Sequence, residues 1–128
     1  MILDSSVLVA ILLFEPGYQE LLARIMASPG VGIGGPTLVE TVIVLAARLR
    51  GDPTAVLKEL LETIGAEVIP FTEDHFRAAL RAYLKFGKGR HPAALNFGDC
   101  LCYAVASIAR EPLLYTGDDF SRTDIRKA

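Results

Sequence analysis

Short apolar runs alternate with longer amphipathic segments along this chain. Four runs predict strands, at residues 1–4, 31–35, 66–71 and 111–116. Between them, apolar residues recur at helical spacing, and proline or glycine marks the ends of several segments. These segments predict helices at residues 5–14, 18–26, 36–50, 52–65, 72–87 and 99–109. Strands that alternate with helices are typical of a parallel sheet covered on both faces. Residues 1–128 are therefore predicted to form a single three-layer α/β/α domain. Its short central parallel sheet should have about four to five strands.

Composition limits what such a domain can be. Hydrophobic residues make up 52% of the chain, and the mean hydropathy is +0.39. This apolar excess predicts surface that a partner covers. No run reaches the ~20 apolar residues of a membrane helix, and the basic start of a signal peptide is missing, so we expect a cytoplasmic protein without a membrane segment. Cys100 and Cys102 lie two apart on a predicted helix, which favours buried free thiols over a disulfide.

The formal net charge is −2. Bulk charge therefore does not indicate a nucleic-acid-binding protein, and any surface that binds phosphate has to be local.

Acidic residues stand where the predicted strands end and where helices begin. Asp4 ends the first strand, and Asp118 and Asp119 follow the last one. Glu40 interrupts the apolar series of helix 36–50, and Asp99 begins the last helix. The carboxyl ends of parallel strands share one edge of a sheet, and that edge is where ligands bind in such folds. We therefore expect these acids to converge.

Each of these acids also has a purely structural interpretation. Any of them can serve as a helix cap or a turn residue, because a carboxylate accepts hydrogen bonds from the free N–H groups there. The structural roles are an N-cap for Asp4, a capping box with Thr37 for Glu40, a capping box with Asn96 for Asp99, and an Asx turn for Asp118 and Asp119. A non-catalytic binding module therefore stays open as an alternative.

Convergence changes this balance. Carboxylates that lie close together repel one another unless a cation neutralises them, and a set of oxygen ligands suits Mg²⁺ or Mn²⁺. The helix starts at Glu40 and Asp99 are expected to favour the ionised form of both side chains. The sequence thus predicts a carboxylate metal cluster.

Four blocks of the sequence resemble a known family in their order and spacing. The blocks are "MILDSSVLVAIL", "TLVETVIVLAARL", "GRHPAALNFGDCLCYAVA" and "PLLYTGDDFSRTDI". Together they resemble the PIN-domain ribonucleases, in particular the VapC toxins of bacterial or archaeal type II toxin–antitoxin systems. The resemblance implies a Mg²⁺- or Mn²⁺-dependent endoribonuclease that inhibits translation or growth until a VapB-like antitoxin neutralises it. It also implies a homodimer.

The resemblance assigns site residues one by one. Asp4, Glu40, Asp99 and one acid of the "GDDF" block take the family's catalytic and metal-binding positions. Ser6 would orient Asp4 or the attacking water. The spacing between the last acid and the phenylalanine varies in the family, so the choice between Asp118 and Asp119 stays open, with Asp119 preferred because it directly precedes Phe120.

A basic loop before the last helix supplies local positive charge. Lys85, Lys88, Arg90 and His91 lie a few residues before the acidic site, where they are expected to guide an RNA backbone. The other interpretation is a solvated loop. His75, near the start of helix 72–87, is expected at the surface.

Other functions fit the chain less well. A phosphatase of the haloacid dehalogenase type needs a second aspartate two residues after Asp4, where this chain has Ser6. A solitary PIN-type RNA-processing nuclease remains an alternative. The apolar helices at residues 18–26 and 37–49 are the candidate surfaces for the antitoxin and for dimerisation.

Overall fold

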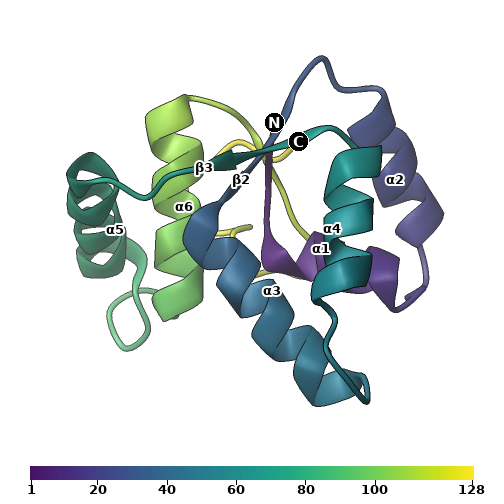
Figure 1. The fold of residues 1–128 in the computed structure, drawn as a ribbon. Helices are drawn as coiled ribbons and strands as arrows, with labels where there is room; N and C mark the ends of the chain where they lie inside the picture. Colours follow the sequence, from purple (N-terminus) through teal and green to yellow (C-terminus); the bar gives the residue numbers. More distant parts are fainter.

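A four-stranded parallel sheet lies at the centre of the structure, a computed structural model that describes residues 1–128 (Figure 1). The spatial order is β3-β2-β1-β4, and every neighbouring pair is parallel. The strands are β1 (Ile2–Leu3), β2 (Val31–Gly34), β3 (Ala66–Ile69) and β4 (Leu113–Leu114). The predicted α/β class is confirmed, and the sheet has four strands.

Six helices surround the sheet (Figure 1). They are α1 (Ser5–Leu12), α2 (Tyr18–Met26), α3 (Gly35–Arg48), α4 (Thr54–Thr63), α5 (Glu73–Phe86) and α6 (Phe97–Ala109). Helices α5 and α6 pack together on one side of the sheet, α1, α2 and α4 lie on the other, and α3 packs against both α1 and α6. None of the helices combines the length and apolarity needed to cross a membrane.

Successive strand residues point into two different cores, as the pleat of a strand requires. Ile2 and Leu113 belong to the core beneath α5 and α6. Their neighbours Leu3 and Leu114 belong to the core beneath α1, α2 and α4. Because the central strands are buried on both faces, the sequence shows them as short continuous apolar runs instead of an alternating pattern.

The chain order creates a switch point in this sheet. Strands β1, β2 and β3 follow one another outward, whereas β4 returns to pair with the opposite edge of β1, with Ile2 beside Leu113 and Leu3 beside Leu114. Connections on the two sides of this pair leave toward different faces of the sheet. A crevice therefore opens beyond the carboxyl ends of β1 and β4, where ligands bind in open parallel sheets.

Two side-chain expectations can be compared with the structure. Cys100 and Cys102 are buried free thiols, as predicted. The expectation for His75 is wrong, because its side chain is only 6% exposed. Its Nδ1 accepts a hydrogen bond from the Thr72 backbone N–H at 3.1 Å, and its ring packs on Phe71. A histidine at the third position of a helix can thus reach back and cap it, which buries the ring.

Candidate functional site

Asp4 and Ser6 form the first part of the site, directly after β1. Asp4 is the N-cap of α1 and is 7% exposed. Its Oδ2 accepts hydrogen bonds from the Ser6 backbone N–H at 3.0 Å and from the Ser6 hydroxyl at 2.5 Å. The Ser6 oxygen also accepts a hydrogen bond from the Thr116 backbone N–H at 3.1 Å. Ser6 therefore fixes Asp4 and also fastens the segment that follows β4 to the end of β1.

Asp99 enters from the start of α6. The Asn96 side chain accepts a hydrogen bond from the Asp99 N–H at 2.9 Å, and Asp99 Oδ2 accepts one from the Asn96 N–H at 2.8 Å. This is the capping box that the sequence indicated. Burial, and to a smaller extent the charges of Asp119 and Asp4, raise the pKa of Asp99 to about 6, against the opposing effect of the Asn96 hydrogen bond.

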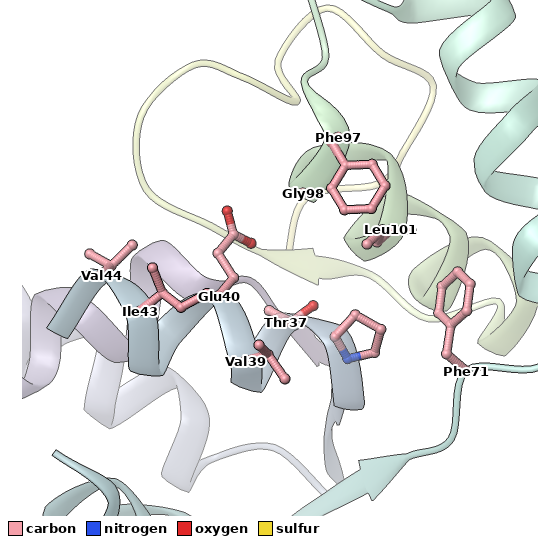
Figure 2. Close-up of a pocket in the computed structure, with 10 residues that line it drawn as sticks. Thr37, Val39, Glu40, Ile43, Val44, Phe71, Phe97, Gly98 and Leu101 are labelled. Atoms are coloured by element: carbon pink, nitrogen blue, oxygen red, sulfur yellow. The ribbon is translucent and has the colours of Figure 1, made fainter. Parts of the chain in front are cut away.

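Glu40 projects from α3 toward the same place. The capping box proposed for it is wrong, because α3 begins at Gly35 with Pro36 in its first turn, so that Glu40 lies in the second turn. Its carboxylate lies against Gly98, where a Cβ would stand 2.5 Å from Oε1 (Figure 2). Only a residue without a side chain leaves room for this carboxylate against the first turn of α6. Glu40 and Asp99 are thereby brought to one helix start.

The charges of these acids act on one another. Burial, then the charge of Asp4, then that of Asp99 raise the pKa of Glu40, while a hydrogen bond with Ser5 lowers it. The expected help from a helix start does not apply to Glu40, which lies in the second turn of α3, and the pKa of Asp99 is raised although it lies in the first turn of α6. Desolvation is the largest cause of both shifts, and the neighbouring charges add to it.

The two adjacent acids after β4 are not equivalent. Both are exposed, in the loop that follows Thr116. The charge of Asp119 acts on the pKa of Asp99, whereas that of Asp118 acts on the pKa of Tyr115. Asp119 is thus the acid of this loop whose charge acts on Asp99.

The acids gather less tightly than the sequence predicted. No group of three or more His, Cys, Asp or Glu side chains is close enough to ligate one ion in this geometry. The donor chemistry nevertheless suits a hard divalent ion, because Asp4 and Asp99 each use Oδ2 for an internal hydrogen bond, which leaves Oδ1 for another ligand.

Two apolar grooves flank the site. The first, of about 800 Å³, runs between α3 and α6 and contains Glu40 itself (Figure 2). The second, of about 530 Å³, runs between α5 and α6. Phe71, Phe97 and Leu101 line both grooves, and Phe97 is 80% exposed at the first position of α6.

The sequence prediction of apolar partner surfaces identified only part of this region. Val39 and Ile43 of α3 are exposed, but α5 was missed. Its exposed Phe76, Leu80 and Leu84 recur at every fourth position, which is the signal of a second apolar stripe on one helix.

The basic residues of the loop are distributed unevenly. Lys88 lines the groove between α5 and α6, beside the start of α6. Arg90 lies over the ring of Tyr83, and His91 packs against Phe86. Lys85 binds Asp124 at 2.7 Å. The structure thus places Lys88 at the groove and gives the other three residues protein neighbours.

Comparison with known proteins relates this arrangement to a family. The PIN domain matches residues 1–126. The chain belongs to the PIN domain family. Among curated relatives, the ribonuclease VapC36 of Mycobacterium tuberculosis is 42% identical over 126 residues, which cover 98% of this chain and 91% of that protein. The ribonuclease VapC42 of the same species is 40% identical and covers 100% of this chain and 98% of the relative.

Solved structures of similar fold support the PIN assignment. The toxin VapC20 of Mycobacterium tuberculosis, described as cleaving the sarcin-ricin loop, superimposes with a TM-score of 0.78 at 17% identity, over 99% of this chain and 97% of that one. VapBC2 of Rickettsia felis, solved on a DNA fragment from its promoter, gives a TM-score of 0.71 at 18% identity, over 98% and 94%. At 17% and 18% identity, these similarities show a shared fold only.

Proposed function

We propose that this PIN domain is a Mg²⁺- or Mn²⁺-dependent endoribonuclease, the toxin of a toxin–antitoxin pair in the cytoplasm. The observation that carries the proposal is that Asp4, Glu40, Asp99 and Asp119 lie at one edge of the sheet, near enough for their charges to raise the pKa of Glu40 and Asp99, in a chain whose relatives are named VapC ribonucleases. Helix capping accounts for Asp4 and Asp99 only, and it explains neither Glu40 nor Asp119. A shared site for a divalent ion accounts for their convergence.

The residues of the site take different parts in this proposal. Asp4 and Asp99 would hold the main ion through their Oδ1 atoms, and Glu40 and Asp119 would complete the set, with Asp118 as the alternative fourth acid. A divalent ion in that position supplies Lewis acidity, which stabilises charge on the scissile phosphate and lowers the pKa of the attacking water. Ser6 keeps Oδ2 of Asp4 occupied, which leaves Oδ1 as the ligand atom.

RNA would approach along the groove that Lys88 lines. We propose that Lys88 and Arg90 contact the phosphate backbone, with His91 and Lys85 beside them, so that these residues position RNA without reading its sequence. Replacing Lys88 by methionine should weaken RNA binding and reduce its salt dependence by about one phosphate contact. An unchanged salt dependence would remove Lys88 from the interface.

The apolar grooves are the proposed partner surfaces. A VapB-like antitoxin and a second copy of the chain would cover apolar area on α2, α3, α5 and Phe97. Such burial would account for the large exposed apolar faces of a chain with 52% hydrophobic residues, because patches of this kind mark interaction sites. Ile43→Glu should reduce the dimer fraction measured by light scattering, because a charge in a buried apolar contact is strongly disfavoured.

Cleavage of RNA tests the proposed activity. Purified protein is incubated with total RNA in Mg²⁺ or Mn²⁺ and in chelator, beside Asp99→Asn. The variant keeps the acceptor that caps α6 but loses the charge, so it should fold and fail to cleave. Cleavage that persists in chelator or in Asp99→Asn would rule out the proposed chemistry.

A further inference from the structure

The loop that carries Asp118 and Asp119 has no helix or strand of its own. Its beginning is held by the hydrogen bond from Thr116 to Ser6. Its end is held by Phe120, which is 2% exposed and packs on the ring of Tyr115. The two acids themselves are exposed. Their position relative to α6 therefore depends on what holds the residues around them.

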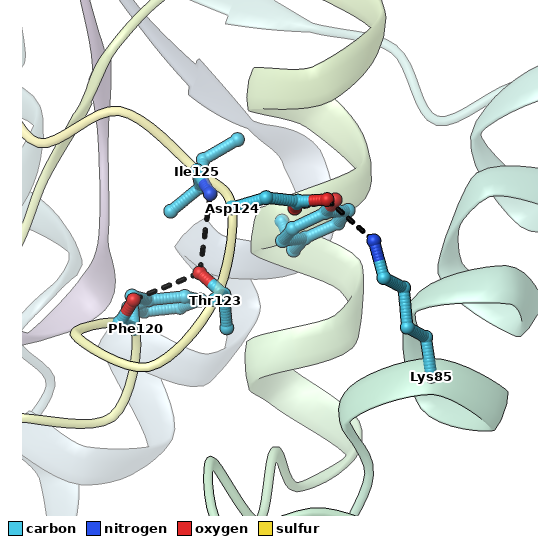
Figure 3. Close-up of polar contacts among 6 residues, drawn as sticks. Lys85, Phe120, Thr123, Asp124 and Ile125 are labelled. Carbon is cyan, nitrogen blue, oxygen red and sulfur yellow. Dashed lines mark hydrogen bonds and ion pairs between the residues drawn. The ribbon is translucent and has the colours of Figure 1, made fainter.

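The residues after Phe120 fold back in a compact turn (Figure 3). The Thr123 hydroxyl donates to the Phe120 carbonyl oxygen at 2.8 Å and accepts from the Ile125 N–H at 3.3 Å. These bonds shape the turn, but they join only residues of the same segment. Phe120 and Ile125 also pack in the core that α6 lines.

Asp124 adds a polar link between this segment and α6. Its Oδ2 accepts a hydrogen bond from the Lys85 ammonium at 2.7 Å (Figure 3). Its Oδ1 accepts one from the Tyr103 hydroxyl at 2.5 Å. The Lys85 and Tyr103 hydrogen bonds lower the pKa of Asp124, so the carboxylate is charged at neutral pH. Tyr103 lies four residues after Asp99 on α6, and residues at that spacing share one helix face.

The geometry points to Asp124 as a positioning residue: with Tyr103 and Lys85 it holds the acidic loop against α6, so that Asp119 stays beside Asp99. This role rests on the proposed nuclease function and assigns Lys85 a part other than direct contact with RNA. Asp124 touches neither the reacting atoms nor the other acids. It acts through the four residues, 120–123, that join it to Asp119.

Four variants separate this role from a general contribution to folding. Tyr103→Phe removes one hydroxyl and keeps the ring against Phe86, and Asp124→Ala removes both hydrogen bonds. The double variant tests whether the two residues act through one contact. Asp52→Ala is the matched control, because Asp52 is also an exposed aspartate that accepts two hydrogen bonds, both from Thr54, away from the acidic group.

Amide hydrogen exchange of the metal-free protein is the first readout. The Ser121 and Thr123 amides donate to Asp118 and Phe120 carbonyls within the loop, so they are protected while the loop is in place. Exchange of these amides should accelerate about tenfold in Tyr103→Phe and Asp124→Ala, the change expected when a hydrogen bond to a charged group is lost. Asp52→Ala should leave both rates unchanged.

The kinetics of RNA cleavage are the second readout. Both variants should lower kcat with KM for RNA unchanged, and the double variant should be no worse than Asp124→Ala alone. Unchanged exchange at Ser121 and Thr123, or a rise in KM with kcat intact, would overturn the inference. If the wild-type protein does not cleave RNA, the proposed function fails, and the exchange rates alone decide whether Asp124 holds the loop.

Discussion

Without metal, the Asp99→Asn variant should be more stable than the wild-type protein. With metal bound, the wild-type protein should be the more stable of the two. Burial and neighbouring charges raise the pKa of Asp99 from 3.8 to about 6. Taken at full size, that shift means that the ionised carboxyl lowers the free energy of unfolding by about 3 kcal/mol. Because the carboxyl is partly exposed, solvent screening reduces the cost to about 1–2 kcal/mol.

The pH dependence of this gain has a definite sign. A carboxyl whose folded pKa is raised binds its proton more tightly in the folded state, so the wild-type protein loses stability as the pH rises from about 4 to about 6. Asparagine carries no titrating proton. The advantage of Asp99→Asn should therefore be absent below pH 4, grow through this window, and stay constant above it.

Urea denaturation at pH 7.5, in chelator and in Mn²⁺, measures both effects. In chelator Asp99→Asn should be the more stable protein by about 1–2 kcal/mol. In Mn²⁺ at 100 times the dissociation constant, the wild type should gain about 2.7 kcal/mol, and the variant much less. Asp74→Asn is the control, because Asp74 is an exposed acid in the first turn of α5 and should give no gain.

Two results would refute this reasoning. A variant that is less stable than the wild type in chelator would mean that helix capping by Asp99 outweighs repulsion among the acids. Equal stabilisation of the wild type and Asp99→Asn by Mn²⁺ would mean that the ion binds elsewhere.

Three further changes have expected results at the same site. Gly98→Ala should displace the Glu40 carboxylate and lower kcat roughly 100-fold, as misplacement by about 1 Å can, while thermal stability is kept. Gly30→Ala is the control, because a Cβ there meets open space, and it should leave kcat unchanged. Full activity of Gly98→Ala would show that Glu40 takes no part in the mechanism. Ser6→Ala should lower both kcat and stability, the latter by about 2 kcal/mol in urea denaturation, and a neutral effect would contradict its role as a link. The cleavage rate at subsaturating Mn²⁺ should fall below about pH 6 as Asp99 becomes protonated, and a flat profile from pH 8 to 5 would argue against its ionised form as a ligand.

Local patterns in the sequence predicted local structure well. The capping box of Asn96 and Asp99 depends on residues three apart, and the structure contains it. The sequence predicts the strands beside the switch point because they are buried on both faces and therefore form apolar runs. The same local reasoning was wrong for Glu40, because "TLVE" imitates a capping box while Pro36 allows the helix to start earlier.

Contacts between distant segments could not be predicted in this way. Ser6 and Thr116 are 110 residues apart, and Tyr103 and Asp124 are 21 apart, so no periodicity or motif relates them. The close approach of Glu40 to Gly98 depends on how α3 and α6 pack. The sequence indicated which acids share an edge of the sheet, whereas the contacts that position them follow from tertiary packing.

The chemistry of the RNA ends tests the central claim most directly. A short RNA is cleaved by the wild-type protein in Mn²⁺, and the termini of the products are identified by mass spectrometry. Attack by water at an acidic metal site does not use the neighbouring ribose hydroxyl, so we expect linear phosphate ends and cleavage that tolerates a 2′-O-methyl group at the cut position. Products that carry a 2′,3′-cyclic phosphate, or cleavage abolished by that methyl group, would contradict the account.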